Sequence, residues 1–164
     1  GGGALFNSKG LDVERIFKNP RDFQGNMAAE DAMCAKCDIL MPCVKESEIN
    51  AGNMKKIQTK VIIEGANGPL TPLAHNYLLE KKVIIAPDIM ANAGGVVVSY
   101  FEWLQNKQGE YWDESAIISR LERKMKHITK KTSLYAKKDG DMRLAAYSIA
   151  INAVAQAKNV IGAQ

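Results

Sequence analysis

Two asparagines and one serine have the chemistry and the surroundings of ligand-binding residues. Asn67 lies in the turn-forming run Gly65–Pro69, Asn92 comes just before the glycine pair at 94–95, and Ser99 follows soon after. Amides and hydroxyls both donate and accept hydrogen bonds, and glycine leaves room for a ligand beside the backbone. Each also has an ordinary structural role: a turn former, a helix cap, a hydroxyl bonded to a carbonyl one turn earlier, or glycines for close helix packing.

The surrounding pattern predicts that both asparagines follow parallel strands. Lys60–Ile63 and Val83–Ala86 are short apolar runs rich in β-branched residues, typical of buried strands, and turn formers end each one. Between them, Thr71–Leu79 predicts a helix, with its threonine as the cap and a proline at the first helical position. This is a βαβ unit, so the two strands should be parallel. Because ligands of such sheets bind beyond the carboxyl ends of the strands, we expect the chemistry at Asn67 and Asn92.

The pattern continues towards the N-terminus as alternating short elements. Cys37–Cys43 is an apolar run stopped by its proline, and it predicts a third buried strand. Short helices are predicted at Leu11–Phe17 and Ala28–Ala35. A polar helical region is predicted at Glu46–Gln58, on the outer face of the sheet.

From Asn92 onwards the spacing is helical. One helix face carries Val96, Ser99, Tyr100, Trp103 and Leu104, and we expect Tyr100 in the core. A loop at Gln105–Trp112 is followed by helices at Glu114–Lys138 and Met142–Val160, separated by a break at 139–141. The predicted fold class is therefore α/β: a partial Rossmann-like, doubly wound, mostly parallel sheet over residues 1–106, with C-terminal helices over 107–164 packing back on it.

Composition is ordinary for one globular domain with a core. The chain has 164 residues, of which 46% are apolar and 24% charged, and its formal net charge is +4. Nothing in it resembles a signal peptide or a membrane-spanning run. Three cysteines are too few for a disulfide scaffold, which indicates a reducing compartment and predicts a cytoplasmic location.

Two further patterns could suggest metal or nucleic-acid binding. Cys34 and Cys37 have the spacing of redox and zinc motifs, but the chain has no second such pair, and its two histidines stand alone. Residues 107–138 hold nine Lys and Arg against four acids, which can indicate nucleic acid. The apolar residues there keep a core-facing period, so a solvated helix face is favoured. We assign no metal site and no nucleic-acid or membrane partner.

The segments Glu64–Pro69, Pro87–Asp88, Asn92–Val96 and Ser99–Trp103 together resemble the coenzyme domain of hexameric glutamate dehydrogenase. Their order and spacing match over nearly the whole chain. The resemblance implies reversible oxidative deamination of L-glutamate to 2-oxoglutarate and ammonia, with NAD or NADP as the hydride carrier. Related leucine, phenylalanine and valine dehydrogenases share the architecture.

The resemblance also implies roles for single residues. Asn67 would hydrogen-bond the nicotinamide ribose and Asn92 the nicotinamide carboxamide, while the backbone at Pro42 and Cys43 would pass beside the coenzyme ribose. Ser99 would hydrogen-bond the distal carboxylate of glutamate. Val96 would shape the pocket for the glutamate side-chain methylenes.

The same resemblance implies a piece of a longer enzyme that forms a hexamer. No Gly-x-Gly-x-x-Gly turn occurs in the chain, and the family's catalytic Lys and Asp belong to a substrate domain without a counterpart here. No catalytic residue is therefore assigned, and NAD is not distinguished from NADP. Two alternatives stay open: a non-catalytic half-domain that acts as an interaction or regulatory module, and another amino-acid dehydrogenase.

Overall fold

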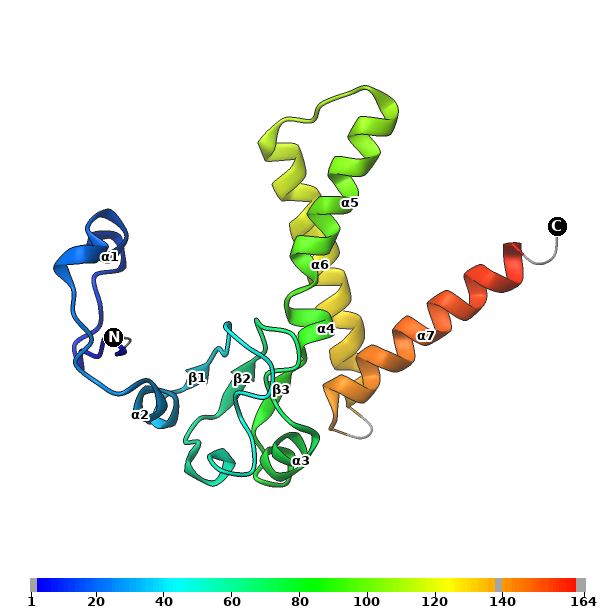
Figure 1. Ribbon diagram of the computed structural model, residues 1–164. Helices are drawn as coiled ribbons and strands as arrows, with labels where there is room; N and C mark the ends of the chain where they lie inside the picture. The colour runs from blue at the N-terminus through cyan, green and yellow to red at the C-terminus, as the bar shows by residue number, and fades with distance from the viewer. Residues whose placement is uncertain (1–2, 138–139, 162–164) are drawn as a thin grey trace.

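A three-stranded parallel sheet organises the computed structural model, which describes residues 3–137 and 140–161 (Figure 1). The strands lie in the order β1 (Ile39–Leu40), β2 (Val61–Ile63), β3 (Ile84–Ala86). The α-helices are α1 (Val13–Lys18), α2 (Ala29–Cys34), α3 (Pro72–Glu80), α4 (Asp88–Ala91), α5 (Ala93–Gln108), α6 (Glu114–Ala136) and α7 (Met142–Ile161), and short 3-10 turns occupy η1 (Pro20–Asp22) and η2 (Met54–Lys56). The predicted α/β class is confirmed.

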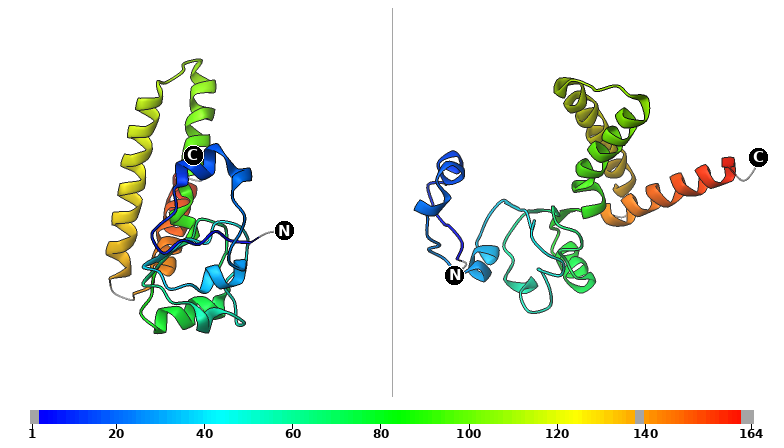
Figure 2. Two further views of the ribbon diagram at one scale, coloured as in Figure 1. Left: turned by 90° about the vertical axis from the view of Figure 1, so that its left-hand side faces the viewer. Right: turned by 45° about the horizontal axis from the view of Figure 1, so that its top comes forward.

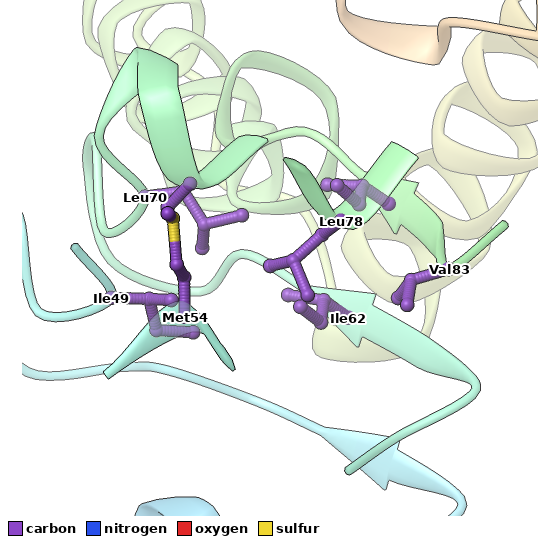
Figure 3. Packing of buried hydrophobic residues seen from close by; sticks show 8 residues of the cluster. Ile49, Met54, Ile62, Leu70, Leu78 and Val83 are labelled. Atoms are coloured by element: carbon purple, nitrogen blue, oxygen red, sulfur yellow. The ribbon is translucent and has the colours of Figure 1, made fainter. Parts of the chain in front are cut away.

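The predicted βαβ unit is confirmed by β2, α3 and β3. The two strands pair in parallel, with Ile62 opposite Ile85. Helix α3 begins as predicted, because the Thr71 hydroxyl accepts a hydrogen bond from the Ala74 N–H at 3.3 Å. Figure 3 shows the core that these elements share, and the cluster consists of Ile49, Met54, Ile62, Leu70, Ala74, Leu78, Val83 and Ile85.

The segment Glu46–Gln58 is not the outer polar helix that was predicted. Ile49 is completely buried, and its N–H donates to the Pro69 carbonyl at 2.9 Å. The Asn50 side chain accepts from a backbone N–H two residues later, which competes with helical pairing. Only the 3-10 turn η2 forms. The prediction was wrong because the polar composition concealed residues that enter the core.

The elements before β2 are more open than predicted. Strand β1 has two residues rather than seven and lies at the edge of the sheet, and Ile39 is 54% exposed, so this strand is not buried. Helix α1 starts two residues later than expected, after Asp12 accepts a hydrogen bond from the Arg15 N–H, and it buries no residue. Figure 1 shows the segment before β1 lying to one side of the sheet.

Helices α5 and α6 form a long hairpin that rises from the sheet in Figure 1. Helix α5 runs four residues into the predicted loop, to Gln108, and ends at Gly109, whose φ of 68° lies in the left-handed region. Its buried residues are Phe101 and Gln105. The expectation that Tyr100 lies in the core was wrong: it is half exposed and stacks on Trp103, with ring centroids 5.8 Å apart.

The last two helices agree with prediction within a few residues. Part of the predicted break between them, residues 138–139, lies outside the described residues. Helix α7 contacts β3, α4 and α6, and Figure 1 and the right-hand view of Figure 2 show its C-terminal part extending away from the sheet. Over residues 3–137 and 140–161, none of the helices combines the length and apolar character needed to cross a membrane.

Candidate functional site

A cavity of about 730 Å³ lies beyond the carboxyl ends of the strands. Three chain segments line it, after β1, after β2 and at the start of α5. Five of the six predicted binding residues are among them: Cys43, Asn67, Asn92, Val96 and Ser99. The other lining residues are Val44, Lys45, Glu46, Gly65, Ala66 and Gly95. Residues distant in sequence thus meet where a parallel sheet binds its ligands.

The two asparagines form a hydrogen-bonded pair at the cavity. The Asn92 amide nitrogen donates to the Asn67 side-chain oxygen at 2.7 Å and to the Gly65 carbonyl at 3.3 Å. Asn92 stands at the cap position of α5, yet its side chain makes no capping bond there, so the helix-cap interpretation fails. Among the described residues, the Asn92 side-chain oxygen and the Asn67 side-chain nitrogen have no partner. The pair therefore offers one acceptor and one donor to a ligand.

Ser99 and Val96 lie on the exposed face of α5 that borders the cavity. Val96 is 75% exposed. Within residues 3–137 and 140–161, no hydrogen-bond partner is found for the Ser99 hydroxyl. By contrast, the Ser148 hydroxyl donates to the Leu144 carbonyl one turn earlier at 2.8 Å. The hydrogen bond to a carbonyl one turn earlier that was considered for Ser99 is thus not formed, and Ser99 lines the cavity.

Three glycines bring backbone close to its neighbours or to the cavity. A Cβ on Gly65 would lie 2.6 Å from the Cys43 sulfur, so a side chain there would displace the thiol. A Cβ on Gly94 would meet the Leu121 side chain at 3.8 Å, an ordinary packing distance. A Cβ on Gly95 would meet nothing within 4 Å and would stand in the cavity wall. Of the helical pair, therefore, Gly94 faces α6 without a close contact that excludes a side chain, and Gly95 leaves open space in the cavity wall.

Pro42 does not line the cavity. Its ring is buried, and its carbonyl accepts hydrogen bonds from the N–H groups of Gly65 (3.0 Å) and Ala66 (2.9 Å). The structure thus shows Pro42 fixing the loop that carries Asn67. Its contact with a coenzyme ribose stays a prediction.

Beneath the cavity, an arginine from α7 joins the two strand-end loops. The Arg143 Nη2 donates to both carboxylate oxygens of Glu64, at 2.5 Å for Oε2, and its Nη1 donates to Asp88 Oδ1 at 2.9 Å. Glu64, directly after β2, is fully buried, and the Asp88 side chain is 15% exposed. The Asp88 N–H in turn donates to Glu64 Oε2 at 2.8 Å. The guanidinium fork compensates two carboxylates at once.

The surroundings of Asp88 and Arg143 favour the ionised forms of both side chains. Burial alone would raise the pKa of Asp88, but the Gly68 and Ile89 N–H groups and the Arg143 guanidinium together hold this pKa below its usual value. Burial would likewise lower the pKa of Arg143, and the Glu64 and Asp88 carboxylates outweigh it and raise that pKa. Asp88 and Arg143 are therefore charged at neutral pH.

Comparison with known proteins places the chain in a family. Residues 1–162 match the model of the family described as Glutamate/Leucine/Phenylalanine/Valine dehydrogenase. The chain belongs to this family. It is 39% identical to the glutamate dehydrogenase of Thermotoga maritima over 165 residues, which cover 94% of this chain and 39% of the relative. It is 35% identical to a cryptic catabolic NAD-specific glutamate dehydrogenase of Bacillus subtilis over 171 residues, covering 98% of this chain and 39% of the relative.

Solved structures of this dehydrogenase family have the same architecture. The glutamate dehydrogenase of Peptoniphilus asaccharolyticus superposes with a TM-score of 0.80 at 32% identity, over 98% of this chain and 38% of that one. The hetero-hexameric glutamate dehydrogenase of Thermus thermophilus gives 0.89 at 24% identity, over 96% and 39%, which compares folds alone. The chain spans about two fifths of the length of these relatives. The predicted resemblance is confirmed.

Sequence reasoning missed the ion network of Glu64, Asp88 and Arg143. Glu64 and Asp88 each stand where an apolar run ends, and a carboxylate at the end of a buried strand needs a cation. That signal was available. The partner was not, because Arg143 lies 79 residues beyond Glu64 on another helix. The Cys34 and Cys37 side chains are half-buried and form no disulfide.

Proposed function

We propose that this chain forms the nicotinamide side of the coenzyme site, and one wall of the glutamate pocket, in an NAD(P)-dependent glutamate dehydrogenase. The reaction is L-glutamate, NAD(P)⁺ and water to 2-oxoglutarate, ammonia and NAD(P)H. The observation that carries the proposal is the meeting of Cys43, Asn67, Asn92, Val96 and Ser99 at one cavity beyond the strand ends. The names of two relatives say NAD-specific, which favours NAD over NADP.

The residues present fit a nicotinamide group. A bound coenzyme would supply the hydride chemistry, and the protein supplies position. The acceptor on Asn92 and the donor on Asn67 match a carboxamide N–H and a ribose oxygen. Gly95 leaves the wall of the cavity open, a space that a Cβ would fill. The chain thus orients the ligand with neutral hydrogen-bonding groups.

The proposed wall of the glutamate pocket combines one polar side chain and one apolar side chain. The Ser99 hydroxyl donates to a carboxylate oxygen of the substrate, and Val96 contacts its methylene groups. Lys45 and Glu46 also line the cavity, and their charges offset each other. A serine alone does not balance a carboxylate, so a cation from the rest of the enzyme completes the pocket, and the catalytic groups come from there too. We propose a homohexamer for the complete enzyme.

Paired substitutions in the complete enzyme test this assignment. Ser99→Ala should lower kcat/KM for glutamate roughly ten- to a hundredfold, because one hydrogen bond to a charged group is lost, and should leave coenzyme affinity nearly unchanged. Asn92→Ala should show the opposite pattern in an equilibrium titration with NADH. Ser148→Ala removes a hydroxyl outside the cavity and serves as the matched control.

The same assays decide between this function and its alternatives. If Ser99→Ala raised the coenzyme Kd and spared glutamate, Ser99 would not be a substrate contact. Rates with leucine or phenylalanine above those with glutamate would identify another amino-acid dehydrogenase. Absence of coenzyme binding in the complete protein would favour the non-catalytic module.

A further inference from the structure

Arg143 does not reach the cavity, yet its contacts lead to both asparagines there. Its side chain lines a separate, smaller cavity of about 320 Å³ with His75 and Tyr147. From there Nη1 donates to Asp88 at 2.9 Å and Nη2 to Glu64. Any effect of Arg143 on a ligand in the larger cavity must therefore pass through other residues.

Asp88 contacts Arg143 and also the backbone at or beside both asparagines. Its carboxylate Oδ2 accepts from the Gly68 N–H at 2.8 Å, one residue beyond Asn67. Its backbone carbonyl accepts from the Asn92 N–H at 3.0 Å. One aspartate thus holds the backbone beside both members of the amide pair. Gly68 has a φ of 55°, a left-handed conformation that this hydrogen bond helps to fix.

We propose that Arg143 is a positioning residue for the amide pair of Asn67 and Asn92, and that it acts through the Asp88 carboxylate. The identity of the ligand that the pair meets rests on the proposed function; the positioning itself does not. The guanidinium fixes one carboxylate oxygen of Asp88 and leaves the other aimed at Gly68. Because Arg143 stands in the first turn of α7, the same contacts transmit a shift of this helix to the pair.

Two conservative substitutions test whether Arg143 and Asp88 position the amide pair or only stabilise the fold. In Asp88→Asn one oxygen is replaced by an amino group, so either the Gly68 N–H or Arg143 loses its acceptor whichever way the amide turns. Arg143→Lys keeps the charge and loses the fork that spans two carboxylates. Gln105→Ala is the control: Gln105 is buried and hydrogen-bonded to the Trp112 N–H at 2.6 Å, away from the cavity.

The experiment combines NMR of the ¹⁵N-labelled 164-residue chain with an equilibrium titration of the complete enzyme by NADH. The side-chain amide signals of Asn67 and Asn92 are assigned by their loss in Asn67→Ser and Asn92→Ser. We expect Asp88→Asn and Arg143→Lys to shift these signals in the free protein and to raise the NADH concentration at half-saturation about tenfold. Gln105→Ala should lower Tm without either change.

Each result decides the proposal. Unshifted amide signals in both variants would overturn it, as would a loss of NADH affinity no larger than that of Gln105→Ala. If the unsubstituted complete enzyme did not bind NADH, the proposed function would fail. The amide signals would still show whether Arg143 and Asp88 position the pair.

Discussion

The loops after β2 and β3 have two sides with opposite chemistry. Towards α7 they present the carboxylates of Glu64 and Asp88, which Arg143 binds in a network with little exposure. Towards the cavity they present the neutral amides of Asn67 and Asn92, which bind each other and keep free hydrogen-bonding atoms. The same two loops thus carry carboxylates that are paired with an arginine and amides that still have hydrogen-bonding atoms available.

This difference shows how a short loop can be held rigidly and still bind a ligand. Ion pairs with low exposure hold geometry strongly, because removing one partner leaves a buried charge uncompensated. Neutral amides that face a cavity contribute little to the free energy of folding. Their atoms without a protein partner can hydrogen-bond a ligand. Stability and binding should therefore respond to different substitutions, and three experiments test that separation in order of decreasing effect.

The largest effect is expected from Arg143→Met. It leaves Glu64, which is fully buried, without a cation, and it should lower the free energy of unfolding by about 3–5 kcal/mol. Urea denaturation measures this loss. The double variant Glu64→Gln with Arg143→Met removes both charges and should recover much of the lost stability. If the double variant were no more stable than the single one, an unpaired charge would not be the cause.

A smaller effect, with a defined pH dependence, is expected from Asp88. Its pKa is lowered in the folded state, so the stability it contributes is fully present above its unfolded pKa, about 4, and is lost as pH falls through the folded value. Asp88→Asn should therefore cost about 1–3 kcal/mol at pH 7 and flatten the fall in stability below about pH 4. Unfolding curves from pH 7 down to pH 2 for both proteins measure the difference. Parallel curves would contradict the assignment.

The two sides also differ in how well sequence predicted them. The cavity side followed from local signals: apolar runs ended by turn formers locate Asn67 and Asn92, and helical spacing locates Ser99 and Val96. The charged side depends on a contact between residues far apart in sequence, which no periodicity encodes.

The errors in the fold have the same cause. Ile49 enters the core because it pairs with the segment before α3, not because of its own polar neighbourhood. Tyr100 shares a helical face with Val96 and Ser99, and spacing alone does not state whether that face meets the core or the cavity. A local pattern predicts a helix or strand and which residues share a face. Whether that face is buried depends on which other segments pack against it.

The smallest stability effect is expected where the cavity side is altered without touching the ion network. Gly94 and Gly95 are consecutive in α5, and replacing either by alanine should raise stability by up to about 1 kcal/mol, because glycine disfavours helix. The new methyl group of Gly94→Ala would pack near Leu121, whereas that of Gly95→Ala would enter the cavity. We therefore expect both variants to melt at or above the Tm of the unsubstituted chain, and only Gly95→Ala to weaken NADH binding severalfold. Equal NADH affinity in the two variants would show that the cavity wall at Gly95 is not part of the binding site.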